Sequence, residues 1–248
     1  MKTQIYIVIG AALLSGCSNT TSDNVTTQGI NADIDVFANG SGSTFVDAEL
    51  EVGDGLGGTS LQLVAGDRLT VTANGIQKIM TEDASIIGRF RYEASFDFDD
   101  AGTMFTVSFS RNNGINAPNS NVTLPEGFVV QSPRSNDVYS LADDVPIQWT
   151  PNGTTITPDI DVSLSCTTTS GIVFTASQDV ATSGDTGVAS LPVAAVIPIG
   201  TLDTTRLCEG EVYFSRWRRG NLDPAYGEGG DITAEHIERA QFFVDLSL

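Results

Sequence analysis

The chain contains a single histidine, His236, which lies between Glu235 and Glu238. A metal site or a general base would need a second ligand or a nucleophile at a suitable spacing. The sequence contains no H-E-x-x-H, no G-x-S-x-G, no phosphate-binding loop and no paired C-x-x-C motif. A Ser-His-Asp set, whose members meet only in space, stays open as an alternative. We therefore expect no catalytic residues, and we predict that His236 is an exposed polar residue in a short helix over residues 231–238.

Acidic segments beside glycines raise the question of a calcium site. Calcium binds six to eight oxygen atoms, which acidic loops often supply. No segment has the spacing of a complete EF-hand loop, and solvated turns account for each of them. We predict no resident metal or other cofactor, with one bound calcium ion as the alternative. The candidate calcium ligands are Asp97, Asp99, Asp100, Asp223, Glu228 and Asp231.

One basic segment interrupts the acidic background, Arg216-Trp217-Arg218-Arg219. It ends an alternating segment, in which Trp217 points away from the face that carries Cys208. An exposed tryptophan with flanking arginines can stack on a sugar ring or anchor a protein partner. We single out these four residues as a candidate binding surface. In the alternative, the loop 220–232 folds over Trp217 and the arginines pair with nearby acids.

The N-terminus has the order of a secretory signal, with Lys2 followed by an apolar run that is too short to span a bilayer. The sequence Leu14-Ser15-Gly16-Cys17 at the end of this run resembles the lipobox of bacterial lipoproteins. The resemblance implies removal of residues 1–16, acylation of Cys17 and a lipid anchor in the membrane. Ser18 in place of Asp is what the family's sorting rule associates with the outer membrane. The resemblance thus implies a lipid-anchored protein of the bacterial cell envelope.

Export also bears on the other two cysteines, because an oxidising compartment favours disulfides. With Cys17 acylated, Cys166 and Cys208 remain as an even pair. Cys166 shares a strand face with Leu164, and Cys208 shares one with Val212. Both thiols therefore point into one core from separate strands, and we predict a disulfide between them.

The charge of the chain limits its partners. It carries 31 Asp and Glu against 12 Lys and Arg, a formal net charge of −19. Phosphate contacts require clusters of Lys and Arg, so we exclude nucleic acid as a partner. The acids are spread over both halves of the chain, which favours a solubilising role through mutual repulsion.

Period-two alternation dominates from residue 30 onward, most clearly in Phe90-Arg-Tyr-Glu-Ala-Ser-Phe-Asp-Phe98. Strands with one buried and one wet face are typical of antiparallel sheets, and glycine turns separate them here. The pattern predicts an all-β chain of two antiparallel β-sandwiches in tandem. The predicted strands include residues 46–52, 69–73, 90–98, 105–109, 127–131, 145–150, 160–167, 171–176, 207–217 and 239–246.

Composition divides the chain into segments. Residues 17–29 are polar and aperiodic, and we predict a flexible tether there. Residues 112–125 contain two prolines and little to bury, so we place a boundary between an N-terminal sandwich, 30–124, and a C-terminal sandwich, 125–248.

The C-terminal half contains Ser132-Pro133 and then Val145-Pro-Ile-Gln-Trp149-Thr-Pro151, which resembles the opening of an immunoglobulin-like or fibronectin type III-like domain. The resemblance implies that fold for the second sandwich. Trp149 precedes both cysteines, unlike the antibody pattern, so the disulfide need not sit where antibody domains place it. Trp149 shares a face with Val145 and Ile147, and we predict that it lies in the core rather than on a ligand platform.

The sequence predicts β-sandwich strands but contains no catalytic motif. We therefore predict a non-enzymatic binding or structural module, with an envelope protein or a glycan as its partner. The alternative is an envelope hydrolase or carbohydrate-active protein, in which acids from different loops meet across a cleft. Two carboxylates on opposite walls of a deep pocket would favour the enzyme. Shallow surfaces with scattered acids would favour binding. A third possibility, a sugar-binding module, would expose Trp217 or several tyrosine rings in one plane.

Overall fold

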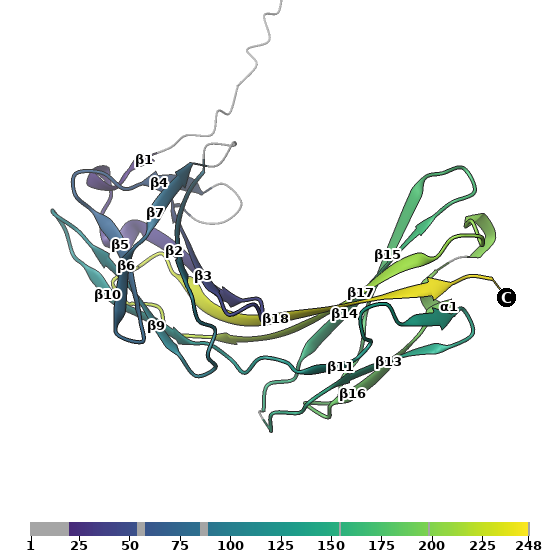
Figure 1. Ribbon diagram of the computed structural model, residues 1–248. Coiled ribbons are helices and arrows are strands. Elements are labelled where there is room, and N and C mark those ends of the chain that lie inside the picture. The colour runs from purple at the N-terminus through teal and green to yellow at the C-terminus, as the bar shows by residue number, and fades with distance from the viewer. Residues whose placement is uncertain (1–19, 54–57, 85–88, 154, 198, 248) are drawn as a thin grey trace, which may run out of the picture.

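The computed structural model describes residues 20–53, 58–84, 89–153, 155–197 and 199–247. Cys17 and the signal sequence lie outside the described residues. The fold is all-β, as predicted, and its strands form three sheets within the described part of the chain. Two lobes rise like the arms of a U from a floor of long strands (Figure 1).

One sheet of 11 strands runs through both lobes. Its main path is β1-β4-β3-β2-β18-β17-β14-β15, and β7, β8 and β12 attach beside it. Most neighbours are antiparallel, whereas β1–β4, β2–β18 and β12–β18 are parallel. The strands are β1 (Thr20–Thr21), β2 (Ile30–Ala38), β3 (Thr44–Val52), β4 (Thr59–Gln62), β7 (Thr81–Ala84), β8 (Phe90–Phe96), β12 (Val138–Ser140), β14 (Asp159–Thr167), β15 (Val173–Asp179), β17 (Cys208–Arg219) and β18 (Gly230–Asp245).

A smaller sheet packs against the large one in each lobe. The N-terminal lobe contributes β5 (Arg68–Ala73), β6 (Ile76–Ile79), β9 (Met104–Ser110) and β10 (Ala117–Thr123); the C-terminal lobe contributes β11 (Val130–Ser132), β13 (Asp144–Trp149) and β16 (Val188–Pro192). Each lobe encloses one hydrophobic cluster, because alternate residues of the facing strands point inward. The short helical elements are α1 (Val193–Val196) and 3₁₀ turns at Ser22–Asn24, Thr27–Gly29 and Ile199–Thr201.

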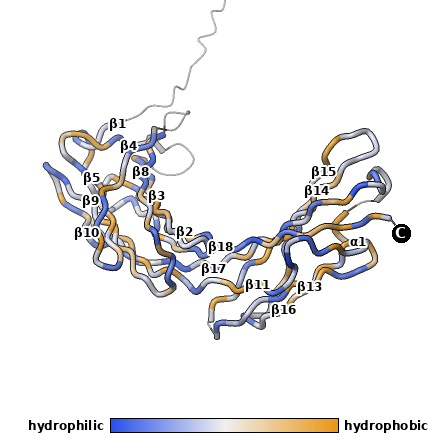
Figure 2. The backbone as a smooth tube through the Cα atoms, in the orientation of Figure 1, coloured by the Kyte–Doolittle hydropathy of each residue, from blue (hydrophilic) through white to orange (hydrophobic). Residues whose placement is uncertain are grey.

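Strands β17 and β18 form the ribbon that joins the lobes (Figure 1). The first half of β18 pairs with β2 of the N-terminal lobe, whereas β17 pairs with β14 of the C-terminal lobe. The N-terminal cluster therefore includes Tyr226, Ile232 and Ala234 from the end of the chain. A cut at residue 125 would leave this cluster incomplete. Along the tube, apolar and polar residues alternate within the strands (Figure 2).

The prediction of a flexible tether was wrong for residues 20–29. Thr20 and Thr21 pair with β4, and Ser22 and Thr27 are buried. The buried Arg111 holds this segment: its guanidinium donates to the carbonyl of Ser22 and, at 3.2 Å, to Oγ1 of Thr27. Hydrogen bonds and the packing of Val25 against the N-terminal core hold this segment, and its polar composition did not indicate either.

Two further segments differ from prediction. Residues 112–125, expected to bury little, contain β10, which pairs with β9 and buries Ala117, Ser120 and Val122. Residues 231–238 form part of β18 rather than a helix, and His236 is buried, not exposed. Pairing with both β17 and β2 outweighs the capping signals at the start of that segment.

The C-terminal core confirms two predictions. Cys166 and Cys208 form a disulfide between the adjacent strands β14 and β17, with 4.4 Å between their Cα atoms. Trp149 is buried in the same cluster, and its Nε1 donates to Oδ1 of Asp185 at 2.7 Å.

Candidate functional site

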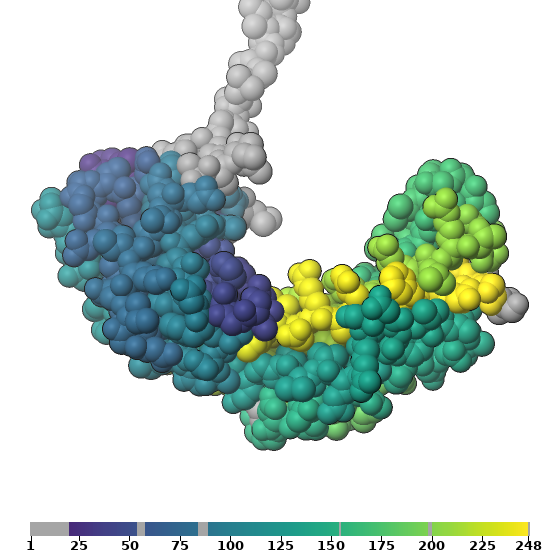
Figure 3. Space-filling view, viewed as in Figure 1, coloured from purple at the N-terminus to yellow at the C-terminus, as the bar shows by residue number. Residues whose placement is uncertain are grey.

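The hollow between the two arms is lined by the outward face of the 11-stranded sheet. Figure 3 shows atoms of β18 and β2 at the floor of this hollow, where no other layer covers them. We call this surface the concave face; it consists of side chains of β3, β2, β18, β17 and β14 that point away from the two hydrophobic clusters. The register of these strands determines which side chains lie side by side on it.

Aromatic rings form a row across the middle of the concave face. Phe45 of β3 lies opposite Phe37 of β2, and their rings stack with centroids 5.3 Å apart. Phe37 lies beside Glu235 of β18, which lies beside Trp217 of β17. Phe45 is 37% exposed and Trp217 52% exposed. Neighbouring strands are about 4.8 Å apart, so this row spans roughly 14 Å of the surface.

Phe37 and Phe45 were not singled out from the sequence. The signal was present: the two residues flank the Asn39-Gly40 turn. The pairing of Ala38 with Thr44 brings the two rings together. A hollow of about 280 Å³ adjoins them, with Asp47, Thr81 and Glu93 among its lining residues.

Strand alternation divides the basic segment of β17 between two faces, so its four residues do not form one surface. The other expectation, that the arginines of this segment pair with nearby acids, is confirmed. Trp217 and Arg219 lie on the concave face, whereas Arg216 and Arg218 point to the other side. Arg216 is fully buried and pairs with Asp185 at 2.6 Å. The other two arginines pair with acids as well, Arg218 with Glu126 and Arg219 with Asp231.

A hydrogen bond fixes the indole N–H of Trp217, while the face of its ring is exposed to solvent. Its Nε1 donates to Oδ2 of Asp159 at 3.1 Å. The loop after β17 does not fold over Trp217; instead it enters the N-terminal core, where the ring of Tyr226 lies 6.3 Å from that of Phe109. The tryptophan therefore presents an oriented ring to the hollow.

A row of carboxylates runs beside the aromatic row. Glu93 of β8, Asp47 of β3 and Asp35 of β2 are successive neighbours across the sheet. Burial raises the pKa of Asp47, and the charges of Glu93 and Asp35 add to this, although Arg91 acts in the opposite direction. The pKa of Asp33 on the next row is also raised, first by burial and then by the charge of Asp231. This end of the concave face is strongly acidic.

The C-terminal end of the concave face carries a second acidic pair. Asp161 of β14 lies opposite Asp179 of β15. The pKa of Asp161 is raised because its carboxyl group shares a hydrogen bond with that of Asp179, and burial adds to this. On the other side of Asp161 lies Tyr213, whose ring is 5.4 Å from the guanidinium of Arg239. Burial, together with Glu235, raises the pKa of Tyr213 to about 12.

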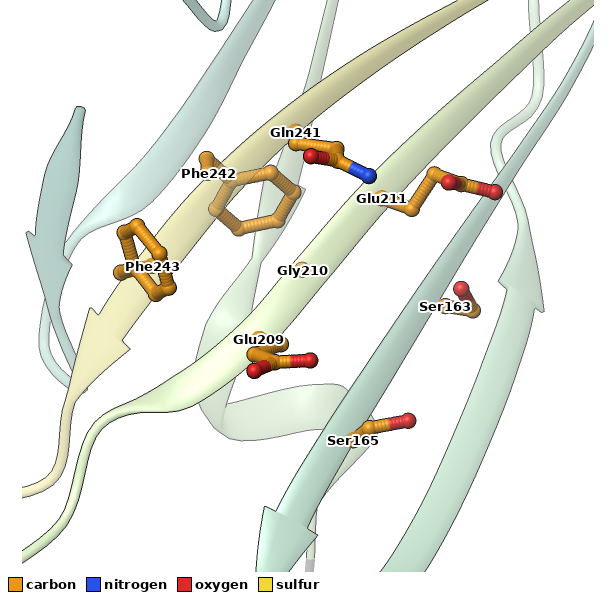
Figure 4. Close-up of a pocket in the computed structure, with 8 residues that line it drawn as sticks. All are labelled: Ser163, Ser165, Glu209, Gly210, Glu211, Gln241, Phe242 and Phe243. Carbon is orange, nitrogen blue, oxygen red and sulfur yellow. The ribbon is translucent and has the colours of Figure 1, made fainter. Parts of the chain in front are cut away.

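A shallow hollow of about 340 Å³ lies between β14, β17 and β18 (Figure 4). Its polar groups come from Ser163 and Ser165 on β14, Glu209 and Glu211 on β17, and Gln241 on β18. Gly210 is required beside it, because a Cβ atom at this position would lie 2.3 Å from the ring of Phe242. The lining offers hydroxyl, carboxylate and amide oxygens, all of which accept hydrogen bonds from a ligand's hydroxyl or amino groups.

Within the described residues, no group of three or more His, Cys, Asp or Glu side chains is arranged to hold a metal ion. Several candidate calcium ligands have protein partners instead. The buried Asp223 accepts from the backbone N–H groups of Asn119 and Ala225, and Asp99 accepts from that of Gly42. His236 lies 3.4 Å from the carbonyl oxygen of Pro125.

The carboxylates of the concave face are neighbours along one sheet. Asp161 and Asp179, like Asp35 and Asp47, lie side by side rather than on opposite walls of a cleft. Such an arrangement lets a carboxylate accept hydrogen bonds from a ligand laid across the sheet.

Comparison with known proteins yields only distant structural matches. No protein-family model and no curated protein matches the sequence. Among solved structures, the Yersinia pseudotuberculosis adhesin InvE aligns with 88% of this chain and 59% of its own, at 11% identity and a TM-score of 0.23. SGBP-B of the mixed-linkage glucan utilization locus of Bacteroides ovatus, solved with a mixed-linkage heptasaccharide, aligns with 98% of this chain and 69% of its own, at 9% identity and a TM-score of 0.20. This chain thus spans less than two thirds of InvE.

In the part of the chain that the structure describes, no helix is both long enough and apolar enough to cross a bilayer.

Proposed function

We propose that this chain is a non-enzymatic binding protein of the bacterial cell envelope that holds a glycan on its concave face. The observation that carries the proposal is the row of Phe45, Phe37 and Trp217 within an acidic surface that is continuous through both lobes. The same proposal includes a lipid anchor at Cys17, a location at the outer membrane and an immunoglobulin-like C-terminal lobe. The resemblances described in the sequence analysis support these three points.

The chemistry of the concave face favours a glycan over a protein partner. The centre of a stable protein interface is apolar and depleted of charge, whereas here charged side chains surround isolated rings. Ring faces stack on the apolar faces of sugars. Carboxylates such as Asp35 and Asp47 accept hydrogen bonds from hydroxyl groups. The acidity of the surface opposes phosphorylated or carboxylated glycans, so we expect a neutral or amine-bearing one.

A pull-down with immobilised neutral, amine-bearing and carboxylated glycans tests this proposal. Trp217→Ala and Phe45→Ala should each weaken binding about tenfold, as loss of a well-placed ring does. Ile79→Ala removes an exposed apolar side chain from β6, on the far side of the N-terminal lobe, and should leave binding unchanged. Equal binding by all three variants, or capture of envelope protein in place of glycan, would contradict the proposal.

The raised pKa of Asp161 beside Asp179 is the observation that favours the enzymatic alternative, since a general acid needs a proton near neutral pH. Incubation with the glycan that binds best distinguishes the two functions. We expect the glycan to be recovered intact after incubation with either the wild type or Asp161→Asn. Release of shorter products by the wild type, lost in Asp161→Asn, would favour the hydrolase.

A further inference from the structure

The first residues of the N-terminal lobe that the structure describes lie close in sequence to Cys17, the proposed lipid anchor. Thr20 pairs with Leu61 of β4, and Oγ of the buried Ser22 accepts from the backbone N–H of Val64 at 3.0 Å. Arg111 also donates hydrogen bonds to Ser22 and Thr27 of this segment. The chain is thus fixed to the lobe from Thr20 onward.

Only two residues separate Cys17 from Thr20 in the sequence. An extended chain spans at most about 3.6 Å per residue, so three steps cover roughly 11 Å. If Cys17 carries lipid, as proposed above, the end of the N-terminal lobe that carries β1 has to face the membrane. The anchor therefore sets the orientation of the whole molecule.

The tip of the other arm lies on the same side of the molecule as β1. In Figure 1 the loop between β14 and β15 rises to the top of the C-terminal lobe, as β1 does on the N-terminal lobe. This tip exposes aliphatic side chains: Ile172 is 67% exposed, Val173 66% and Leu207, on the adjacent segment, 48%. We call these three residues the apolar tip.

The apolar tip is held in shape by its backbone. Thr168 and Ile172 exchange hydrogen bonds within the loop, the backbone N–H of Thr168 donating to the carbonyl of Ile172 at 2.8 Å. The loop is tied to the segment before β17, because Thr169 donates to Thr201 and Asp203 donates to Thr167. These backbone hydrogen bonds therefore fix the positions from which the exposed side chains project.

Charge sets the apolar tip apart from the rest of this acidic chain. Residues 166–178 contain no Asp, Glu, Lys or Arg, in a protein whose formal net charge is −19. On the neighbouring segment, Asp203 and Arg206 pair with each other at 3.5 Å. A surface that enters the headgroup region has to lose water, and uncharged aliphatic side chains gain by this, whereas carboxylates lose.

We propose that the apolar tip rests in the headgroup region of the membrane that holds the lipid anchor. The protein would then be an arch with two contacts, the acylated Cys17 at one arm and Ile172, Val173 and Leu207 at the other. The concave face opens toward the bilayer, so that a glycan on it lies between the protein and the lipid. The inference rests on the lipid anchor named under the proposed function.

An environment-sensitive nitrobenzoxadiazole dye on a single introduced cysteine tests the arch. Ile172→Cys places the dye in the apolar tip; Val188→Cys, 58% exposed on β16 at the opposite side of the C-terminal lobe, is the matched control. The full-length lipidated protein is reconstituted into phosphatidylcholine–phosphatidylethanolamine vesicles with and without nitroxide-labelled lipid. We expect nitroxide lipid to quench at least half of the emission at residue 172 and to leave that at residue 188 unchanged.

The outcomes separate the anchor from the arch. If the protein floats with the vesicles and residue 172 is not quenched, or both positions are quenched equally, the arch is wrong and the anchor stands. If the emission at residue 172 is as low in vesicles without nitroxide lipid as in vesicles with it, the tip contacts a second copy of the chain, and the arch is wrong. If the protein does not float and Cys17 has no added lipid mass, both proposals fail.

Discussion

At the scale of single residues, one buried ion pair connects the segments that meet at the base of the C-terminal lobe. Arg216 donates to Asp185 at 2.6 Å and to the carbonyl of Gly127 at 2.9 Å, and its guanidinium lies 4.2 Å from the ring centroid of Phe128. Asp185 also accepts from Trp149 Nε1. Burial opposes ionisation of Asp185, but these hydrogen bonds and the charge of Arg216 outweigh it, so its pKa is lowered.

Loss of Arg216 should be strongly destabilising. Arg216→Ala leaves the carboxylate of Asp185 buried without its cation, and we expect the free energy of unfolding to fall by about 3–5 kcal/mol. Arg206→Ala removes an exposed pair with Asp203 and should change it by less than about 1 kcal/mol. Urea denaturation of both variants measures the difference; coincident unfolding curves would contradict the structural role of Arg216.

Asp33 should contribute less to the stability of the protein near neutral pH than in mild acid. Its raised pKa means that the folded state binds the proton more tightly than the unfolded state. This contribution to stability therefore falls as the pH rises from the ordinary aspartate pKa through the raised one. Asp33→Asn removes the charge, so we expect its Tm to exceed that of wild type by roughly 2 °C at pH 7, with the gap closing toward about pH 4. Asp100→Asn, in an exposed turn, is the control; a gap that is independent of pH would contradict the assignment.

At the scale of the elements, strand alternation explains most of the molecule. It sends Cys166 and Cys208 into one core, and it places Trp217 and Arg216 on opposite faces of β17. The local pattern therefore predicted many of the strands, the disulfide and the buried Trp149. It did not predict that Phe37 lies beside Glu235, with Trp217 on the other side of Glu235, because these neighbours are set by the pairing of β18 with β2 and β17, and β2 and β18 are far apart in the sequence. His236 and residues 20–29 were misjudged for the same reason, since their partners are distant in the chain.

The disulfide between β14 and β17 should contribute substantially to the C-terminal lobe. It links residues 42 positions apart, and closing a loop of that length contributes about 4 kcal/mol on the chain-entropy estimate. We expect Cys166→Ser, or reduction of the wild type, to lower the Tm of this lobe by roughly 10 °C. Hydrogen exchange localises the effect: faster exchange in β14 and β17 agrees with it, and unchanged exchange after complete reduction would contradict it.

At the scale of the whole molecule, the ribbon of β17 and β18 makes the two lobes depend on each other. Ile232 and Ala234 of β18 complete the N-terminal core, and the same strand supplies Phe242 and Val244 to the C-terminal core. The concave face exists because one sheet continues through both lobes. Neither lobe corresponds to one contiguous stretch of sequence.

A fragment that ends at the boundary predicted from the sequence should therefore not fold. Residues 18–125 lack Tyr226, Ile232 and Ala234 and lose the strand that pairs with β2. We expect this fragment to melt without a cooperative transition by circular dichroism, whereas residues 18–248 melt cooperatively. A well-dispersed NMR spectrum of the fragment would contradict the shared core.

The most direct test of glycan binding on the concave face is photo-crosslinking in living cells. A photo-crosslinking amino acid replaces Trp217 in one strain and Val188, which faces away from the hollow, in another. We predict that light produces a glycan adduct from position 217, detected by mass spectrometry of the adjoining peptide, and none from position 188. The same adducts from both positions, or an adduct from position 188 alone, would contradict the account.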